Sequence, residues 1–183
     1  MINKFKIRKA EPAHQKAIAD LHTLSWRTHY RGVCSDEYLD DFIFEERQKV
    51  WRERFESHDP DMLILVAENE ENELVGFVCT FLNHHEKYGA YLDNLHVDPD
   101  CHGMGLGKQL MQRTATVINN EKRDEQIYLH VLKENEGAIK FYERIGGKRI
   151  AEYEDDMPWG GKGIIIDYLW DIDQLIEESN LND

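Results

Sequence analysis

Three alternating glycines follow a proline turn near the middle of the chain, in the segment Val97-Asp-Pro-Asp-Cys-His-Gly-Met-Gly-Leu-Gly-Lys108. The glycines let successive backbone N–H groups converge on one anion, because no side chain stands in the way. The amphipathic stretch from Leu106 to about Asn119 predicts a helix directly behind them. Its N-terminus adds amide donors and the positive end of a dipole, and Lys108 adds a cation. The segment therefore predicts a phosphate-binding turn for an anionic cofactor.

Two common phosphate-binding loops do not match this segment. A P-loop ending at Gly107-Lys108 requires glycine in place of His102, and Ser or Thr in place of Gln109. A dinucleotide-binding fingerprint requires a small residue where Lys108 or Leu110 stands, for close packing of the helix on the strand. The turn must belong to another class of phosphate site.

The segment resembles the pyrophosphate loop of the GNAT superfamily of N-acetyltransferases, which reads Arg or Gln, two residues, Gly, one residue, then Gly or Ala. Here the motif is His102-Gly-Met-Gly105-Leu-Gly107, with histidine in place of Arg or Gln. The glycines are kept, so backbone binding is expected to survive this departure. Downstream, the apolar strand pattern at 126–132 precedes Asn135-Glu-Gly-Ala-Ile-Lys-Phe-Tyr142-Glu-Arg-Ile-Gly146, which is similar to the family's Asn, Ala, Phe-Tyr, Gly signature.

The resemblance implies an α/β fold of the α+β type, with helices flanking a mixed, mostly antiparallel sheet of about seven strands. A splayed pair of strands, at 90–97 and 126–132, would form the acetyl-CoA cleft. The length of 183 residues suits one domain. We assign residues 1–171 to this N-acetyltransferase domain and 172–183 to an acidic C-terminal tail that is expected to fray.

Hydrophobic periodicity predicts the elements that position these motifs. Further strands are expected at 5–9, 63–68, 74–82, 148–153 and 163–170. A helix opening at Pro12 is expected to carry Ala17, Leu21, Leu24 and Thr28 on one face. Ser35 is expected to cap a second helix with Tyr38, Leu39 and Phe42 buried, and a third is expected at 45–55.

The same resemblance implies acetyl-CoA as cosubstrate and no metal. The main chain of the strand before the loop would line the pantetheine arm, where a backbone N–H would polarise the acetyl carbonyl. Asn135 would hydrogen-bond that arm, cap its own helix, or do both. The predicted coenzyme-binding residues are Leu95, His96, Val97, His102, Gly103, Met104, Gly105, Leu106, Gly107, Lys108 and Asn135.

Two residues are predicted to be catalytic. Tyr142 matches the tyrosine that protonates the departing coenzyme A thiolate in many similar enzymes; the alternative is a packed aromatic on the buried stripe of its helix. Asp93 is the candidate general base, acting directly or through water; the alternative is an exposed carboxylate at a strand edge. His96 is a second candidate base, or else a packed and hydrogen-bonded histidine.

The implied function is transfer of acetyl from acetyl-CoA to a primary amine by direct attack in a ternary complex. A small cationic acceptor such as a polyamine is the first expectation. Acetylation of a protein N-terminus or lysine is the alternative within the enzymes, and a non-catalytic acyl-CoA sensor is the alternative from another class. A net charge of −14 disfavours nucleic acid as a partner. A homodimer is left open.

Composition also bears on the compartment. The three scattered cysteines, Cys34, Cys79 and Cys101, are typical of reduced thiols rather than of a disulfide framework. The longest apolar runs are far below membrane-spanning length, and the basic N-terminal residues lack the apolar core of a signal peptide. We therefore expect a cytoplasmic protein with no membrane contact.

Overall fold

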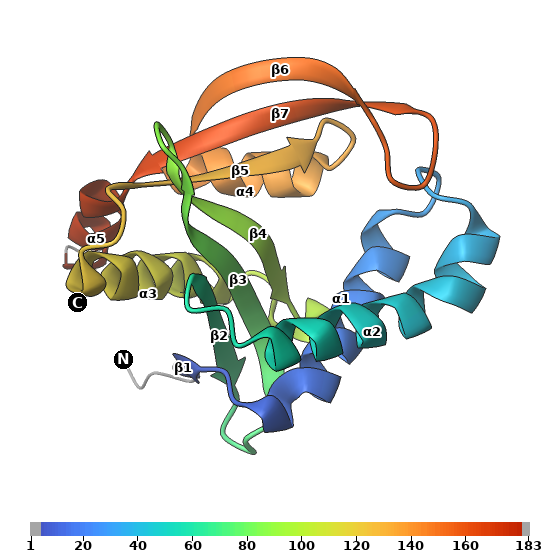
Figure 1. The fold of residues 1–183 in the computed structure, drawn as a ribbon, viewed down its shortest axis with the longest axis horizontal. Coiled ribbons are helices and arrows are strands. Elements are labelled where there is room, and N and C mark those ends of the chain that lie inside the picture. Colours follow the sequence, from blue (N-terminus) through green and yellow to red (C-terminus); the bar gives the residue numbers. More distant parts are fainter. Residues whose placement is uncertain (1–4, 181–183) are drawn as a thin grey trace. The chain divides into compact units, whose positions relative to one another are not determined.

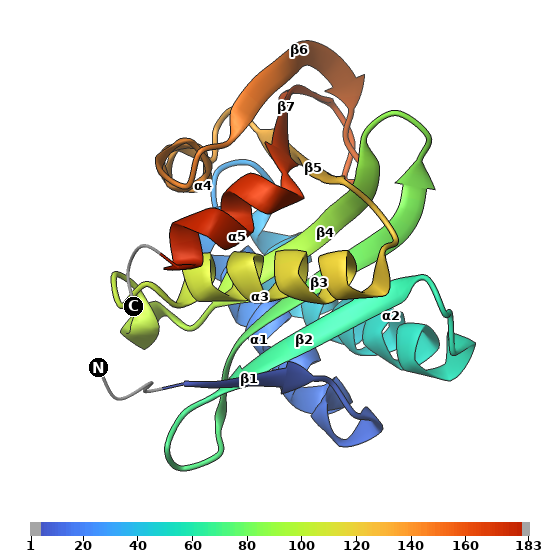
Figure 2. The same ribbon diagram turned by 90° about the vertical axis from the view of Figure 1, so that its left-hand side faces the viewer.

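The computed structural model describes the backbone of residues 5–180 and the side chains of residues 5–177. Its described part contains a seven-stranded sheet in the order β1-β2-β3-β4-β5-β7-β6 (Figures 1 and 2). The strands are β1 (Lys6–Lys9), β2 (Met62–Glu68), β3 (Leu74–His85), β4 (Gly89–Val97), β5 (Gln126–Leu132), β6 (Lys148–Asp156) and β7 (Lys162–Asp171). The predicted class, an α/β fold with a mostly antiparallel sheet and flanking helices, is confirmed.

The helices connect and flank these strands. They are α1 (Gln15–His29), α2 (Ile43–Ser57), α3 (Leu106–Glu121), α4 (Glu136–Arg144) and α5 (Ile172–Asn180), with the short turns η1 (Pro12–His14), η2 (Tyr38–Phe42) and η3 (Pro99–Cys101). The chain forms two compact units. Unit 1 runs to Cys79 and includes Asn94–Leu110, and unit 2 contains Thr80–Asp93 and the chain from Met111 onward.

In unit 1, helix α1 buries a different face from the predicted one. Leu24 is 43% exposed and Thr28 is exposed, whereas Leu21 is buried as expected. The buried positions include Ile18 and the polar His22, which is 2% exposed. His22 lies 2.9 Å from the indole nitrogen of Trp26 and 3.0 Å from that of Trp51, and its neutral ring can accept a hydrogen bond from one of these N–H groups. The two helices predicted after Ser35 form one almost continuous helical run, in which η2 leads directly into α2. Ser35 accepts a hydrogen bond from the Tyr38 N–H as predicted, but Phe42 is 56% exposed rather than buried.

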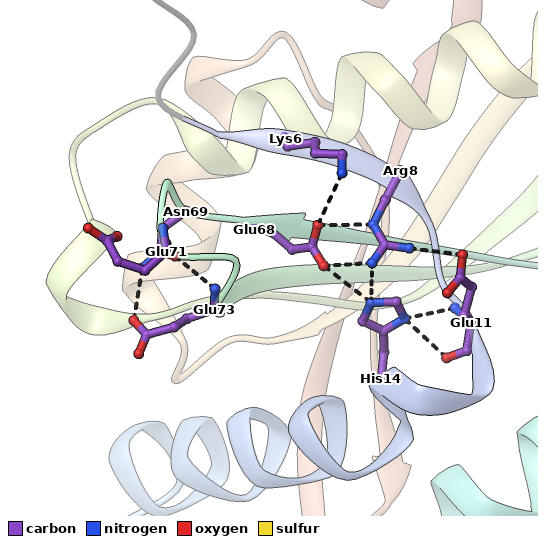
Figure 3. A network of polar contacts seen from close by, with 8 residues as sticks. All are labelled: Lys6, Arg8, Glu11, His14, Glu68, Asn69, Glu71 and Glu73. Carbon is purple, nitrogen blue, oxygen red and sulfur yellow. Dashed lines mark hydrogen bonds and ion pairs between the residues drawn. The ribbon is translucent and has the colours of Figure 1, made fainter.

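An ion cluster around the buried Glu68 ties the first strand of unit 1 to the second (Figure 3). β1 and β2 pair antiparallel, with Lys6 opposite Glu68. The Glu68 carboxylate is 5% exposed and accepts two hydrogen bonds from Arg8, one from Nε at 2.9 Å and one from Nη2 at 2.7 Å. The hydrogen bond from Arg8, then that from His14, and the charges of Arg8 and Lys6 lower the pKa of Glu68 to about 2, against the opposing effect of burial.

Replacing Glu68 by glutamine is expected to destabilise the protein by about 2 kcal/mol at pH 7, because Arg8 keeps its charge and loses its bidentate partner. The folded-state pKa of Glu68 lies below its ordinary value of 4.5, so this contribution is present above pH 4.5 and is lost as the pH falls toward 2. Urea denaturation at several pH values measures the effect. Glu70→Gln, at an exposed turn position, is the matched control and is expected to change stability little. A constant gap between wild type and Glu68→Gln from pH 7 down to pH 2 would contradict this account.

In unit 2, the C-terminal strands form a curved layer, seen at the top of Figure 1. β5 pairs antiparallel with β7 along its whole length, from Gln126↔Asp171 to Leu132↔Ile165, and β6 pairs antiparallel with β7. β4 joins β5 in parallel at Ala90↔Ile127 and Tyr91↔Tyr128. The chain after Asp171 continues as α5, in which Ile172 and Leu175 are buried, so this segment begins as a packed helix where a frayed tail was expected. Residues 181–183 of the predicted tail lie outside the described residues.

Candidate active site

The predicted phosphate turn is built at the end of β4 in unit 1. The Asp98 N–H donates to the Val75 carbonyl at 2.8 Å, which fixes the chain where it leaves β4. The Asp98 carboxylate accepts a hydrogen bond from the Asp100 N–H at 2.9 Å and so caps η3, whose first residue is Pro99. The chain therefore enters the glycine segment from a fixed direction.

Gly103 and Gly105 adopt the left-handed backbone conformation, with φ values of +77° and +79°. Only glycine reaches this region without strain, which explains the residue type at both positions. A methyl group built on Gly103 meets nothing within 4 Å, and one built on Gly105 meets only Gln109 Nε2, at 4.0 Å. Both stretches of backbone are therefore open on the side where a side chain would stand.

Helix α3 begins at Leu106, directly behind these glycines, and Gly107 lies within its first turn. The Gln109 N–H donates to the Gly105 carbonyl at 3.1 Å. The amides of the first turn precede this bond and point out of the helix N-terminus, as the geometry of an α-helix requires. Open glycine backbone followed by a helix N-terminus fits an anionic diphosphate. Met104, between the two left-handed glycines, is 52% exposed.

The His102 side chain turns back toward the strand. Its Nε2 lies 3.0 Å from the Val97 carbonyl oxygen, and its ring stacks at 6.5 Å on that of His29. His102 thus links the start of the glycine segment to the end of β4. The contact of His102 with the coenzyme stays a prediction.

On β4, the half-buried His96 contacts three side chains of unit 1. Ser25 Oγ and His96 Nδ1 share a hydrogen bond of 2.7 Å, and the ring centroids of His22 and Phe77 lie 4.7 and 5.2 Å from that of His96. Burial, followed by the nearby positive charges of His29 and Arg47, lowers the pKa of His96 to about 3. The ring is neutral at physiological pH. This packing favours the interpretation of His96 as a fixed strand residue over that of a general base. Leu95 and Val97, its neighbours on β4, are half-buried.

His22 connects His96 to two tryptophans. The indole N–H of Trp26 donates to His22 Nε2 at 2.9 Å, and that of Trp51 points at His22 Nδ1 from 3.0 Å. Burial, followed by the charges of His96, Arg47 and Arg54, lowers the pKa of His22 well below its ordinary value. Sequence reasoning missed both His22 and Ser25. The available signal was their i, i+3 spacing on α1, on the face that also carries Ile18.

Unit 2 carries the other predicted residues, Asp93, Asn135 and Tyr142. Asn135 Oδ1 accepts a hydrogen bond from the Ala138 N–H at 3.1 Å, so the predicted helix cap at the start of α4 is present. Asp93 lies on β4 and is half-buried. The binding of Asn135 to the coenzyme and the role of Asp93 as a base stay predictions.

Tyr142 packs against β7. It is 9% exposed, and its ring centroid lies 5.7 Å from that of Trp170 and 6.1 Å from that of Tyr168. Its carbonyl accepts a hydrogen bond from the Gly147 N–H at 2.9 Å, at a site where any larger residue would place its Cβ 2.5 Å from the Trp170 ring. The position of Tyr142 is therefore closely fixed, which a packed aromatic and a positioned acid both require.

No helix in the described range 5–180 is both long enough and apolar enough to cross a membrane. Within the same range, no group of three or more His, Cys, Asp or Glu side chains is arranged to hold a metal ion.

The chain resembles known acetyltransferases in sequence and in fold. The model of the acetyltransferase (GNAT) family matches residues 18–147. The peptidyl-lysine N-acetyltransferase YjaB of Escherichia coli strain K12 is 28% identical over 116 residues, which cover 63% of this chain and 70% of YjaB. The spermidine N(1)-acetyltransferase of Thermoplasma acidophilum is 26% identical over 140 residues, which cover 72% of this chain and 84% of that relative.

Among solved structures, the PaiA N-acetyltransferase from Thermoplasma acidophilum in complex with coenzyme A is similar, with a TM-score of 0.69 at 24% identity. The match covers 91% of this chain and 99% of that one. The glycine turn, the sheet order and the family match agree with one another. The chain therefore belongs to the GNAT family of acetyltransferases and is an acetyl-CoA-dependent N-acetyltransferase.

Proposed function

We propose that this enzyme acetylates a primary amine of a small cationic metabolite, by direct attack of the amine on the thioester in a ternary complex. The observation that carries the coenzyme half of this proposal is the open backbone of Gly103 and Gly105 ahead of α3. The similarity to a spermidine acetyltransferase and the net charge of −14 support a cationic acceptor.

The backbone is proposed to hold and polarise the thioester. The amides at 103–108 bind the diphosphate, with Lys108 as a further positive charge, and the main chain at 95–97 lines the pantetheine arm. A backbone N–H there stabilises the charge that develops on the acetyl oxygen, and such a donor contributes about 3 kcal/mol to the transition state. Side-chain substitutions at 95–97 are therefore poor tests of this role.

Two side chains are proposed to move protons. Asp93 accepts the proton of the substrate ammonium, directly or through water, which leaves a neutral amine. The amine nitrogen then bonds to the acetyl carbon, the carbon–sulfur bond breaks, and Tyr142 donates its phenolic proton to the departing thiolate. Proton transfer from the new amide nitrogen, relayed through solvent, restores the tyrosine.

An acceptor panel tests the proposed substrate class. Thiol release from acetyl-CoA is measured with spermidine, with butylamine and with a lysine-containing peptide. The expected result is the highest kcat/KM with spermidine and initial-rate patterns of a ternary complex. The similarity to YjaB makes a peptidyl lysine the specific alternative. Turnover with the peptide alone would replace the proposed acceptor, and a protein that gains an acetyl group in the absence of amine would exclude direct attack.

A further inference from the structure

A row of tyrosine and histidine rings crosses one face of the sheet in unit 2, and the mechanism above does not use it. Tyr128 and His130 are two residues apart on β5 and so point to the same face. The register places Tyr91 of β4 opposite Tyr128, and Asp167 of β7 opposite His130. We call this set the aromatic stripe, and it consists of His84, Tyr91, Tyr128, His130, Tyr153 and Asp167.

The rings of His84, Tyr91, Tyr128 and His130 contact one another in a continuous series. The ring centroid of Tyr91 lies 5.2 Å from that of Tyr128 and 5.2 Å from that of His130, and the His84 centroid lies 5.0 Å from that of Tyr91. His84 Nδ1 and the Tyr128 hydroxyl share a hydrogen bond of 2.6 Å. The three tyrosine rings of the stripe are electron-rich, and the faces of such rings attract an organic cation.

Asp167 places a carboxylate within this series. Its side chain is 14% exposed, and its Oδ1 lies 2.6 Å from His130 Nδ1 and accepts a hydrogen bond from the Tyr153 hydroxyl at 3.3 Å. Among the residues that the structure describes, none donates a hydrogen bond to Oδ2. Burial first, and then the charge of Asp167, raise the pKa of Tyr128 and raise that of Tyr153 to about 12. Both phenols therefore stay protonated beside a negative charge.

The stripe is accessible at one end. Tyr153 is 39% exposed, and the His130 side chain is 37% exposed, whereas Tyr128 is 4% exposed and therefore buried. Rings with a half-buried carboxylate disfavour an anionic ligand and favour an ammonium group, which gains both cation–π and charge-assisted contacts. An apolar ligand gains nothing from the carboxylate.

We propose that the aromatic stripe binds the distal ammonium group of the acceptor, the one that is not acetylated. This inference rests on the proposed function. Asp93, the proposed base, lies two residues beyond Tyr91 on β4. A diamine or polyamine with one ammonium over the stripe then extends along this strand toward the residue that deprotonates the other.

Asp167→Asn tests the inference, with Asp156→Asn as the matched control, because Asp156 is an exposed residue of β6 outside the stripe and the charge change is the same. Calorimetric titration of the coenzyme A complex with spermidine is expected to show about tenfold weaker binding for Asp167→Asn and no change for the control. In the activity assay, kcat/KM is expected to fall about tenfold for spermidine and to stay constant for butylamine, which has no second ammonium.

Two substitutions of Tyr153 distinguish the contribution of its ring from that of its hydroxyl. Tyr153→Phe keeps the ring face and is expected to bind spermidine within about twofold of wild type, whereas Tyr153→Ala is expected to bind about fivefold more weakly. Unchanged spermidine binding by Asp167→Asn, absence of spermidine binding by wild type, or equal losses for spermidine and butylamine would each overturn the inference. If wild type acetylates no amine but loses spermidine binding on Asp167→Asn, the proposed function fails while the cation site stands.

Discussion

Substitution of Tyr142 by phenylalanine is expected to lower kcat by ~10²–10⁴-fold, the usual contribution of a positioned general acid. The change removes only the hydroxyl. The ring keeps its packing between α4 and β7, where it is 9% exposed and contacts the rings of Trp170 and Tyr168. The fold and the KM for acetyl-CoA are therefore expected to stay close to wild type. Steady-state thiol release and thermal unfolding of the variant measure both quantities.

Tyr168→Phe is the matched control for this experiment. Tyr168 is a fully buried tyrosine of β7 in the same ring cluster, and its hydroxyl donates to Glu143 Oε1 at 2.9 Å. Its loss is expected to reduce stability modestly and to leave kcat unchanged. Equal rates for Tyr142→Phe and wild type would remove the tyrosine from the mechanism. Equal losses in the two variants would show that the cluster matters for packing and not for proton transfer.

Features set by local chemistry were predictable from the sequence. The glycines at 103 and 105 were predicted to free the backbone, and the structure gives both a positive φ that other residues reach only with strain. β5 has the predicted bounds, 126–132, because its mostly apolar and partly alternating pattern is typical of a strand. The cap at Asn135 follows from its own side chain, which accepts from an amide three residues on.

Features that depend on distant contacts were not predictable in this way. Apolar periodicity put Leu24 on the predicted face of α1, whereas the structure buries His22, which lies beside the indole N–H groups of Trp26 and the distant Trp51. The aromatic stripe was not predicted from the sequence for the same reason, because it depends on contacts between distant segments. Tyr128 and His130 were assigned to a buried strand, and only the pairing of β5 with β7 brings Asp167 opposite His130. The register in which β5 pairs with β7 cannot be read from a single sequence.

These two kinds of feature correspond to the two proposed binding sites, one for the coenzyme and one for the acceptor. The proposed coenzyme site uses backbone groups, so its signal is a spacing of glycines that is read directly from the chain. The proposed acceptor site uses side chains from several strands, so its signal exists only once the sheet is assembled. This difference explains why the family and the cosubstrate were identified from the sequence, while the acceptor site had to be inferred from cross-strand contacts.

Substitution of Gly105 by glutamate is expected to weaken coenzyme A binding by about 100-fold, because it places a carboxylate beside the proposed diphosphate site. Space alone does not forbid the side chain, since a Cβ at this position meets only Gln109 Nε2 at 4.0 Å. Gly105 has a φ of +79°, and a non-glycine residue there costs about 1–2 kcal/mol in backbone strain. The affinity must therefore be separated from the loss of stability, by titrating coenzyme A at a temperature where each variant is folded.

Two further variants make this separation. Gly105→Ala introduces the strain without the charge and is expected to lose less than tenfold in affinity. Gly160→Glu introduces the same strain and charge at another open left-handed glycine, with a φ of +92° in the turn between β6 and β7, and is expected to bind coenzyme A as wild type does. If Gly105→Glu binds coenzyme A as tightly as Gly160→Glu, the diphosphate is not held by these amides, and the proposed mechanism loses its anchor. If binding falls only in Gly105→Glu, and falls less at high salt, the loss is electrostatic and the diphosphate lies at the glycine turn.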